Sequence, residues 1–256
     1  MIDDQTNKDW PQSLLAGNVA SNFSGLKDEF DAQGYFLRHN VISAKVCERI
    51  IQQIKDLKFI RVVSKSRHGD SIFYTANSAQ LLSIPEVSGL LNELQNLIKG
   101  CFGRRFRKLD NDVIGVSVNV IGHGGTFSRH FDRNYLTVSI YLNAVRGGET
   151  LVWPKMNYDR VPLLKVSHRK WLMYRLLNIV RPVRIPPAAG TLLLFDNKAA
   201  HQVLKVEGGT FRFSLIFAFD NQAKSYKNQR DNYGYGESTL DFDQVCAEAN
   251  EALATR

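Results

Sequence analysis

Short, strongly β-prone segments fill the second half of the chain, and this pattern limits the folds that the chain can adopt. About eight of them follow Asp112, and glycine, asparagine, aspartate and proline separate them. They read "VIGVSVNVI", "TFSRHFD", "YLTVSIYLN", "ETLVWP", "PVRIPP", "TLLLFD", "AHQVLKV" and "RFSLIFAFD". Short strands with turns at this spacing predict an antiparallel jelly roll made of two sheets, or a barrel.

The residues before this region carry helical and strand-like patterns. Apolar residues recur at helical spacing in 44–57 and 83–102, and Ser43 is placed to cap the first of these helices. "FIRVVSK" and "SIFYTA" predict strands, and "FDAQGYFLRHNVIS" predicts the end of a helix followed by a strand. We therefore expect a mainly β fold with flanking helices that brace one face of a sheet.

The length of 256 residues falls within the range of one larger β domain. We expect a single domain over 1–256, with bracing helices and strands in 1–110 and the jelly-roll core in 111–220. The core carries an insertion over 155–184, in which 166–180 predicts a helix. A polar tail over 221–256 ends in a short acidic helix near 243–254.

Cysteine usage and the N-terminal composition bear on the compartment. Three cysteines, far apart and odd in number, do not form a disulfide framework. Residues 1–20 contain no apolar signal-peptide region, and no apolar run approaches the length of a membrane span. We expect a cytoplasmic protein without stable membrane insertion.

Positive charge is concentrated in one segment. The whole chain carries a formal net charge of +8. Residues 155–184 hold eight lysines and arginines against one acid, so this segment alone carries +7. No nucleic-acid-binding motif surrounds it, and we expect no nucleic-acid partner. The charge and apolar side chains of the segment fit an anionic or apolar small molecule.

His130 and Asp132 stand two residues apart at the start of a β-prone run. Residues i and i+2 of a strand point to the same face, so both side chains can reach one atom. A third candidate ligand, His201, follows 71 residues after His130. Two imidazoles and one carboxylate suit a mononuclear Fe(II) oxygenase, although a zinc hydrolase uses a similar set. A surface turn is the plainer interpretation of the His-x-Asp pair taken alone.

Further motifs in the same region carry a family resemblance. "SIYLN" is followed by "RGGETLVWP" and then by "PPAAGTLLLFDNKAAHQVLKVEGGTFRFSLIFAFD". Over 112–220 the sequence resembles the Fe(II)/2-oxoglutarate-dependent dioxygenases, in particular the prolyl 4-hydroxylase-like branch. "EFDAQGYFLRHNVISAKVCERI" is similar to the first helix and strand of that branch. The resemblance implies a double-stranded β-helix, which is a distorted, cupin-like jelly roll.

The resemblance also implies a chemistry. His130, Asp132 and His201 would be the iron ligands, and Fe(II), 2-oxoglutarate and O₂ the cofactor and cosubstrates, with ascorbate as a candidate reductant. 2-Oxoglutarate would be decarboxylated to succinate and CO₂ while a substrate is oxidised. Members that halogenate lack the carboxylate ligand, so Asp132 favours oxygen transfer or a related oxidation.

A basic group must hold the far carboxylate of 2-oxoglutarate. Arg212 lies 11 residues after His201, and Ser214 shares its strand face. An arginine fork matches a carboxylate with two hydrogen bonds. By resemblance, Arg212, Ser214 and Tyr141 would bind this cosubstrate. The plainer interpretations are a surface ion pair for Arg212 and a core position for Tyr141.

The substrate is less constrained by the sequence. Close prolyl hydroxylases commonly have a tyrosine ten residues before the first iron ligand, where this chain has Val120. That difference favours a small-molecule substrate over a peptidyl proline, and a catalytically silent jelly-roll module is a third alternative. We expect the 155–184 insertion to act as a lid over the pocket, and the plainer interpretation is a surface segment whose apolar side packs on the barrel. The substrate-side residues that we expect are Val120, His123, Trp153, Trp171 and Tyr174. A surface-loop histidine is the plainer interpretation of His123, and a core position suits Trp153 equally well.

Overall fold

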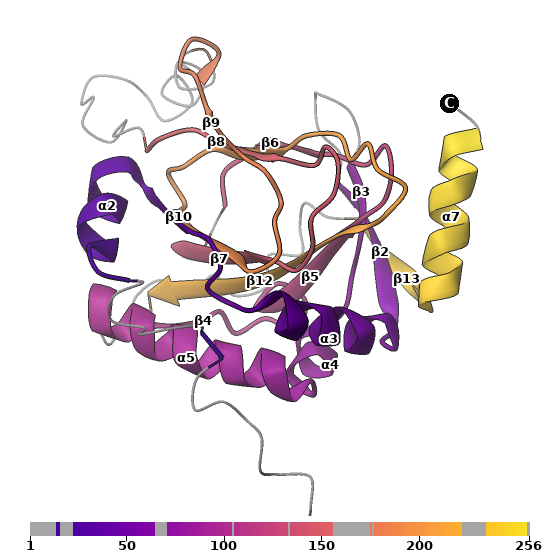
Figure 1. Ribbon diagram of the computed structural model, residues 1–256, viewed down its shortest axis with the longest axis horizontal. Coiled ribbons are helices and arrows are strands. Elements are labelled where there is room, and N and C mark those ends of the chain that lie inside the picture. The colour runs from indigo at the N-terminus through magenta and orange to yellow at the C-terminus, as the bar shows by residue number, and fades with distance from the viewer. Residues whose placement is uncertain are drawn as a thin grey trace, which may run out of the picture.

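The computed structural model describes residues 14–15, 23–64, 71–103, 105–132, 134–155, 175, 177–221 and 234–254. Two antiparallel sheets form the centre of this structure (Figure 1). The large sheet has the strand order β1-β10-β7-β12-β5-β3-β2-β13, with β4 paired to β12, and the small sheet has the order β6-β11-β8-β9. This two-sheet architecture confirms the predicted jelly roll.

The large sheet draws its strands from the whole length of the chain. They are β1 (Tyr35–Arg38), β2 (Phe59–Ser64), β3 (Ser71–Thr75), β4 (Phe106–Lys108), β5 (Val116–Ile121), β7 (Leu136–Tyr141), β10 (Thr191–Asp196), β12 (Arg212–Asn221) and β13 (Gly234–Leu240). The small sheet consists of β6 (Phe127–His130), β8 (Thr150–Val152), β9 (Val183–Ile185) and β11 (His201–Val203).

Helices cover the large sheet on the face that points away from the small sheet (Figure 1). The described helices are α2 (Leu26–Gln33), α3 (Ala44–Lys55), α4 (Ser78–Leu82), α5 (Pro85–Phe102) and α7 (Phe242–Ala254). Ser43 caps α3 as predicted, because its Oγ accepts a hydrogen bond from the Val46 amide at 3.3 Å. Bracing of one sheet face by helices is thereby confirmed.

Alternation along β12 divides its residues between two environments. Phe213, Leu215, Phe217 and Phe219 are buried in the core between the sheet and the helices. Arg212 and Ser214 point the other way, toward the small sheet, because successive strand residues face opposite sides. The apolar face of the strand therefore anchors the fold, while its opposite face lines the interior of the jelly roll.

Every strand predicted in the second half of the chain is observed, and the structure contains further elements that the sequence pattern did not predict. All eight predicted segments contain a strand. The short β4, the helix α4 and the edge strand β13 were not predicted. β13 has the polar, glycine-rich sequence "GYGESTL", which lacks the alternation of a half-buried strand, and it pairs with β2 in the structure. The N-terminal region and the tail thus extend the large sheet itself.

Most of the 155–184 insertion lies outside the described residues. Trp171, Tyr174 and ten of the fifteen residues of the helix predicted over 166–180 lie outside the described ranges. Its described C-terminal part packs on the protein: Leu177 is buried against Trp153 and Ala200. The predicted lid therefore stays a prediction.

Cys47, Cys101 and Cys246 are all free, and burial raises the pKa of the Cys47 thiol to about 11. No helix within the described ranges has the length and apolar character needed to cross a bilayer.

A glycine at the start of β10 offers a test of this architecture. Gly190 has φ +76°, and a Cβ atom there would lie 2.0 Å from the Ile42 carbonyl oxygen. We expect Gly190→Ala to lower the free energy of unfolding by at least about 1–2 kcal/mol, because both the left-handed backbone and the contact are unfavourable. Urea denaturation measures the change.

The matched control is Gly100→Ala, in helix α5, where a Cβ atom would meet nothing within 4 Å. Alanine there should stabilise by about 0.5–1 kcal/mol, because alanine loses less backbone entropy than glycine in a helix. Equal effects of the two substitutions would contradict the close approach of β10 to the 41–42 segment.

Candidate active site

The pairing of β6 with β11 brings two histidines together. His201, the first residue of β11, is the direct cross-strand partner of His130, the last residue of β6. Asp132 follows β6 by two residues, and its Oδ1 lies 3.4 Å from His130 Nε2 and 3.6 Å from His201 Nε2. One ligand atom from each of the three residues lies within 4.8 Å of the others. The surface-turn interpretation of the His-x-Asp pair is therefore wrong.

Backbone carbonyls orient both imidazole rings. His130 Nδ1 lies 2.8 Å from the Ser128 carbonyl oxygen, and His201 Nδ1 lies 3.3 Å from the Ala199 carbonyl oxygen. A carbonyl only accepts hydrogen bonds, so each Nδ1 carries the proton and each Nε2 keeps its lone pair. Both lone pairs are on the side of Asp132, as a metal centre requires.

Electrostatics favour the metal-binding protonation states of the cluster. Burial lowers the pKa of His201 to about 4, with a further contribution from nearby His130, so this imidazole is neutral at neutral pH. Burial alone would raise the pKa of Asp132, but His201, His130 and the Thr137 hydroxyl outweigh it and hold that pKa well below its usual range. The cluster thus offers a neutral imidazole at His201 and an ionised carboxylate at Asp132.

The cluster is open on one side. Phe195 packs against the ring of His201 with centroids 4.3 Å apart, and Phe127 packs against His130 at 4.6 Å. The His201 side chain is 9% exposed, whereas that of His130 is 26% exposed. A ligand can therefore approach the three donor atoms from the His130 side while the protein encloses the other side.

A buried guanidinium lies elsewhere in the same interior. Arg212 is 2% exposed, donates a 3.0 Å hydrogen bond from Nη2 to Thr150 Oγ1, and stands 4.9 Å from the centre of the Tyr141 ring. The Tyr141 hydroxyl also donates to Thr150 Oγ1, at 2.7 Å. Gly148, with φ +65°, leaves room for Arg212, since a Cβ there would lie 3.0 Å from Arg212 Cδ. These contacts fix the arginine in one place.

Within the described ranges, this arginine has no counter-ion, which a buried cation requires. No carboxylate among the described residues pairs with it, which excludes the predicted alternative of a surface ion pair within that part of the chain. The Arg212 Nε and Ser214 Oγ atoms are buried without a hydrogen-bond partner. Burial lowers the pKa of Arg212, because removing a charge from water without pairing it is unfavourable. An anion held here would satisfy both unpaired donors.

Strand β7 connects the cluster with the arginine. The Thr137 hydroxyl donates to Asp132 at one end of its interior face, and Tyr141 contacts Arg212 at the other. Four residues of strand separate them, or about 13 Å. The interior therefore presents a candidate metal centre at one end and an unpaired cation at the other, which suits a short molecule with carboxylates at its two ends.

Val120, one of the predicted substrate-side residues, faces away from this interior. Val120 is fully buried in the core against the helices, so its assignment as a substrate-side residue is wrong; the residue was placed by its spacing from His130 alone. Its neighbour Asn119 is the cross-strand partner of Ser214, and so Asn119 lies on the interior face. Near the Ser214 position, the polar group that β5 presents to the interior is thus the amide of Asn119.

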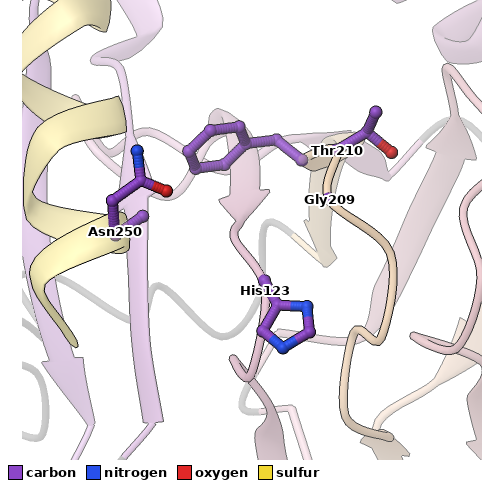
Figure 2. Close-up of a pocket in the computed structure, with 6 residues that line it drawn as sticks. His123, Gly209, Thr210 and Asn250 are labelled. Carbon is purple, nitrogen blue, oxygen red and sulfur yellow. The ribbon is translucent and has the colours of Figure 1, made fainter. Parts of the chain in front are cut away.

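His123 lines a different cavity. Its Nδ1 lies 3.1 Å from the Gly208 carbonyl oxygen, and with Gly209, Thr210 and Asn250 it surrounds a hollow of about 130 Å³ beside helix α7 (Figure 2). None of the metal-cluster residues line this hollow. The geometry therefore gives no support to His123 as a substrate residue and favours its alternative interpretation as a loop histidine.

Trp153 packs against the described end of the insertion. Its indole Nε1 donates to the Leu177 and Val180 carbonyl oxygens at 2.9 and 3.1 Å, and its ring lies 5.2 Å from the guanidinium carbon of Arg129. It is 5% exposed. Trp153 is therefore a buried anchor for the described end of the insertion, which is the core role that the sequence left open.

Two threonines were missed by sequence reasoning. Thr150 joins Arg212 to Tyr141, and Thr137 holds Asp132. Both stand within quoted motifs, "RGGETLVWP" and "YLTVSIYLN". Strand alternation is the signal that could have found Thr137, because it shares a face with Tyr141. For Thr150 no sequence signal existed, since its contact crosses from one sheet to the other.

Comparison with known families bears on the central region of the chain. Residues 116–220 match the model of the 2OG-Fe(II) oxygenase superfamily. This range contains the three cluster residues, Tyr141 and Arg212. No curated protein matches the chain.

Solved structures share the fold. An oxidoreductase of the 2OG-Fe(II) oxygenase family from Burkholderia pseudomallei aligns with a TM-score of 0.52 and 19% identity, over 81% of this chain and 95% of its own. The epimerase SnoN from nogalamycin biosynthesis gives 0.57 and 16%, over 78% and 83%. A prolyl hydroxylase from Trichoplax adhaerens, in complex with a hypoxia inducible factor peptide fragment, gives 0.55 and 16%, over 80% and 92%. At these identities the likeness establishes the fold.

The cluster geometry predicts a single metal site that needs both histidines. We expect His201→Ala to abolish stoichiometric Co(II) binding, measured by isothermal titration calorimetry at neutral pH, because it removes a buried nitrogen donor. Circular dichroism should show an unchanged fold. His123→Ala, which changes a histidine outside the cluster, is the control and should bind like the wild type.

Proposed function

We propose that this protein, whose residues 116–220 belong to the 2OG-Fe(II) oxygenase superfamily, is a 2-oxoglutarate-dependent dioxygenase that hydroxylates a small molecule. The observation that carries the proposal is the presence, in one interior, of a His-Asp-His cluster and a buried arginine with unpaired donors. A silent binding module would have no need to keep both features. The donor set suits Fe(II), which binds two histidines and one carboxylate and keeps open positions for other ligands.

The three residues of the cluster would bind the metal. His130 and His201 would donate through Nε2, and Asp132 through the oxygen that faces both rings. When bound, Fe(II) together with O₂ supplies oxidation of a carbon–hydrogen bond, coupled to decarboxylation of 2-oxoglutarate to succinate and CO₂. The packed rings of Phe195 and Phe127 limit movement of the histidines and exclude water from behind them.

The arginine end of the interior would hold the far carboxylate of 2-oxoglutarate. Arg212 offers the unpaired Nε–H and a guanidinium without a counter-ion, and Ser214 offers a hydroxyl on the same face. Thr150 fixes the arginine through Nη2, so the fork is oriented before the cosubstrate arrives. Arg212 and the cluster residues thus provide one anchor for each end of the molecule.

The proposal of a small-molecule substrate rests on what faces the interior. Val120 is turned into the helix-packed core and supplies no hydroxyl. Asn119 and Ser117 present short polar groups on the interior face of β5 instead. SnoN, of similar fold, belongs to nogalamycin biosynthesis, whereas the Trichoplax enzyme was solved with a peptide. Retention of Asp132 favours oxygen transfer.

A turnover screen scored by succinate release tests the function. Purified protein with Fe(II), 2-oxoglutarate and O₂ is incubated with panels of small organic acids, aromatic metabolites and proline-containing peptides. We expect stimulated succinate release with a small molecule and a product heavier by one oxygen atom. Stimulation by peptides alone would replace the small-molecule proposal with a peptidyl hydroxylase. Absence of any 2-oxoglutarate turnover would leave a binding module.

The cosubstrate role of Arg212 predicts a specific defect. Removing one partner of a buried charge pair costs about 2 kcal/mol or more, which corresponds to roughly 30-fold or more in affinity. We expect Arg212→Ala to raise the apparent Michaelis constant for 2-oxoglutarate by at least this factor, and Tyr141→Phe to raise it less. Succinate release at varied 2-oxoglutarate concentration measures both.

Arg146→Ala is the matched control, because the Arg146 side chain is 79% exposed and pairs with the exposed Glu207. Its 2-oxoglutarate constant should equal that of the wild type. An unchanged constant in Arg212→Ala would move the carboxylate site to another basic residue, such as Lys205.

A further inference from the structure

A chain of hydrogen bonds leads from the 134–137 segment to Asp132. The Asn134 side-chain Nδ2 lies 2.9 Å from Thr137 Oγ1 and 2.6 Å from the Leu136 carbonyl oxygen. The Thr137 hydroxyl in turn bonds to Asp132 Oδ2. Thr137 is 3% exposed, so its hydroxyl has little access to water that could replace these partners. This series of hydrogen bonds is therefore a fixed feature of the interior.

The donor and acceptor groups fix the direction of every hydrogen bond in this series. The Leu136 carbonyl only accepts, so the amide atom beside it must be the nitrogen, and that nitrogen donates to Thr137 as well. With its oxygen accepting from Asn134, the Thr137 hydroxyl directs its single proton to Asp132 Oδ2. An ionised carboxylate only accepts hydrogen bonds, so the last bond has the same direction.

The two oxygens of Asp132 consequently have different partners. Oδ2 accepts from Thr137, whereas Oδ1 lies 3.4 Å and 3.6 Å from the Nε2 atoms of His130 and His201. A carboxylate can bind a metal through one oxygen or through both. Here one oxygen is already held by the protein and only the other faces the histidines.

We propose that Thr137, oriented by Asn134, restricts Asp132 to binding the metal through Oδ1 alone and so keeps three of the six coordination positions open. The inference rests on the proposed function, because it requires a metal at this cluster. Three open positions are what a bidentate cosubstrate and O₂ together need. A second oxygen from Asp132 would occupy one of them. Thr137 is thus a positioning residue that acts through Asp132.

The test counts the open positions directly. Mn(II) is bound to the wild type and to Thr137→Val, which keeps the side-chain shape and removes the hydroxyl. Water-proton relaxation per bound Mn(II) reports how many water molecules occupy the open positions. We expect three for the wild type and fewer for Thr137→Val. Metal affinity should also fall by about 10–100-fold, as is typical when the hydrogen-bond partner of a ligand is lost.

Matched variants separate positioning from packing. Thr137→Ser keeps the hydroxyl and should restore the water count and the affinity. Asn134→Ala should shift both in the same direction as Thr137→Val, but less. Thr75→Val removes another buried hydroxyl of the large sheet, whose one hydrogen bond within the described residues goes to the neighbouring Ala76 carbonyl, and it should behave like the wild type.

A failure of the Thr137 proposal can be told apart from a failure of the proposed function. A wild-type water count in Thr137→Val, or failure of Thr137→Ser to restore it, would overturn the positioning role while leaving the metal site intact. Failure of the wild type to bind Mn(II) at the cluster, with His201→Ala as reference, would overturn both proposals.

Discussion

The register between β6 and β11 is the constraint on which the candidate active site depends. It sets His201 directly opposite His130, although 71 residues separate them in the sequence. A shift of the β6–β11 register by one residue would turn one histidine to the outer face of the small sheet, and the three ligands would no longer lie together. The register is supported on both sides, because β11 also pairs with β8 and the Trp153 amide donates to the Ala200 carbonyl oxygen. Packing of the small sheet therefore determines the ligand geometry.

The second constraint is a positive charge that is buried without a counter-ion in the described part of the chain. Arg212 opens a strand whose other face is a row of phenylalanines packed on helices, so the strand cannot turn to release the arginine into water. The fold thus maintains an unfavourable electrostatic state that an anionic ligand would relieve. Because the buried guanidinium has no anionic partner and its hydrogen-bond partners are fixed, this site favours binding of a carboxylate over binding of a neutral group.

The cluster and the arginine are linked through β7, which supplies Thr137 near Asp132 and Tyr141 near Arg212. Both residues lie on one face because their positions differ by an even number. One strand thereby fixes the distance between the two anchors of the interior. This is why a rigid central strand, rather than a loop, carries the residues that set the size of the molecule that fits between them.

The sequence by itself determined the strands of the second half, the helices of the first, and the residues of the cluster. These features follow from local signals: turn punctuation, apolar periodicity, and the i, i+2 spacing of His130 and Asp132. It failed at Val120, because counting back from His130 does not reveal which face of β5 each residue takes. Only the tertiary structure decided that Asn119 faces the interior, that Thr150 holds Arg212, and that β13 closes one edge of the sheet. Each of these depends on pairing between segments distant in sequence, and the energy of such pairing comes from register and burial that no local pattern encodes.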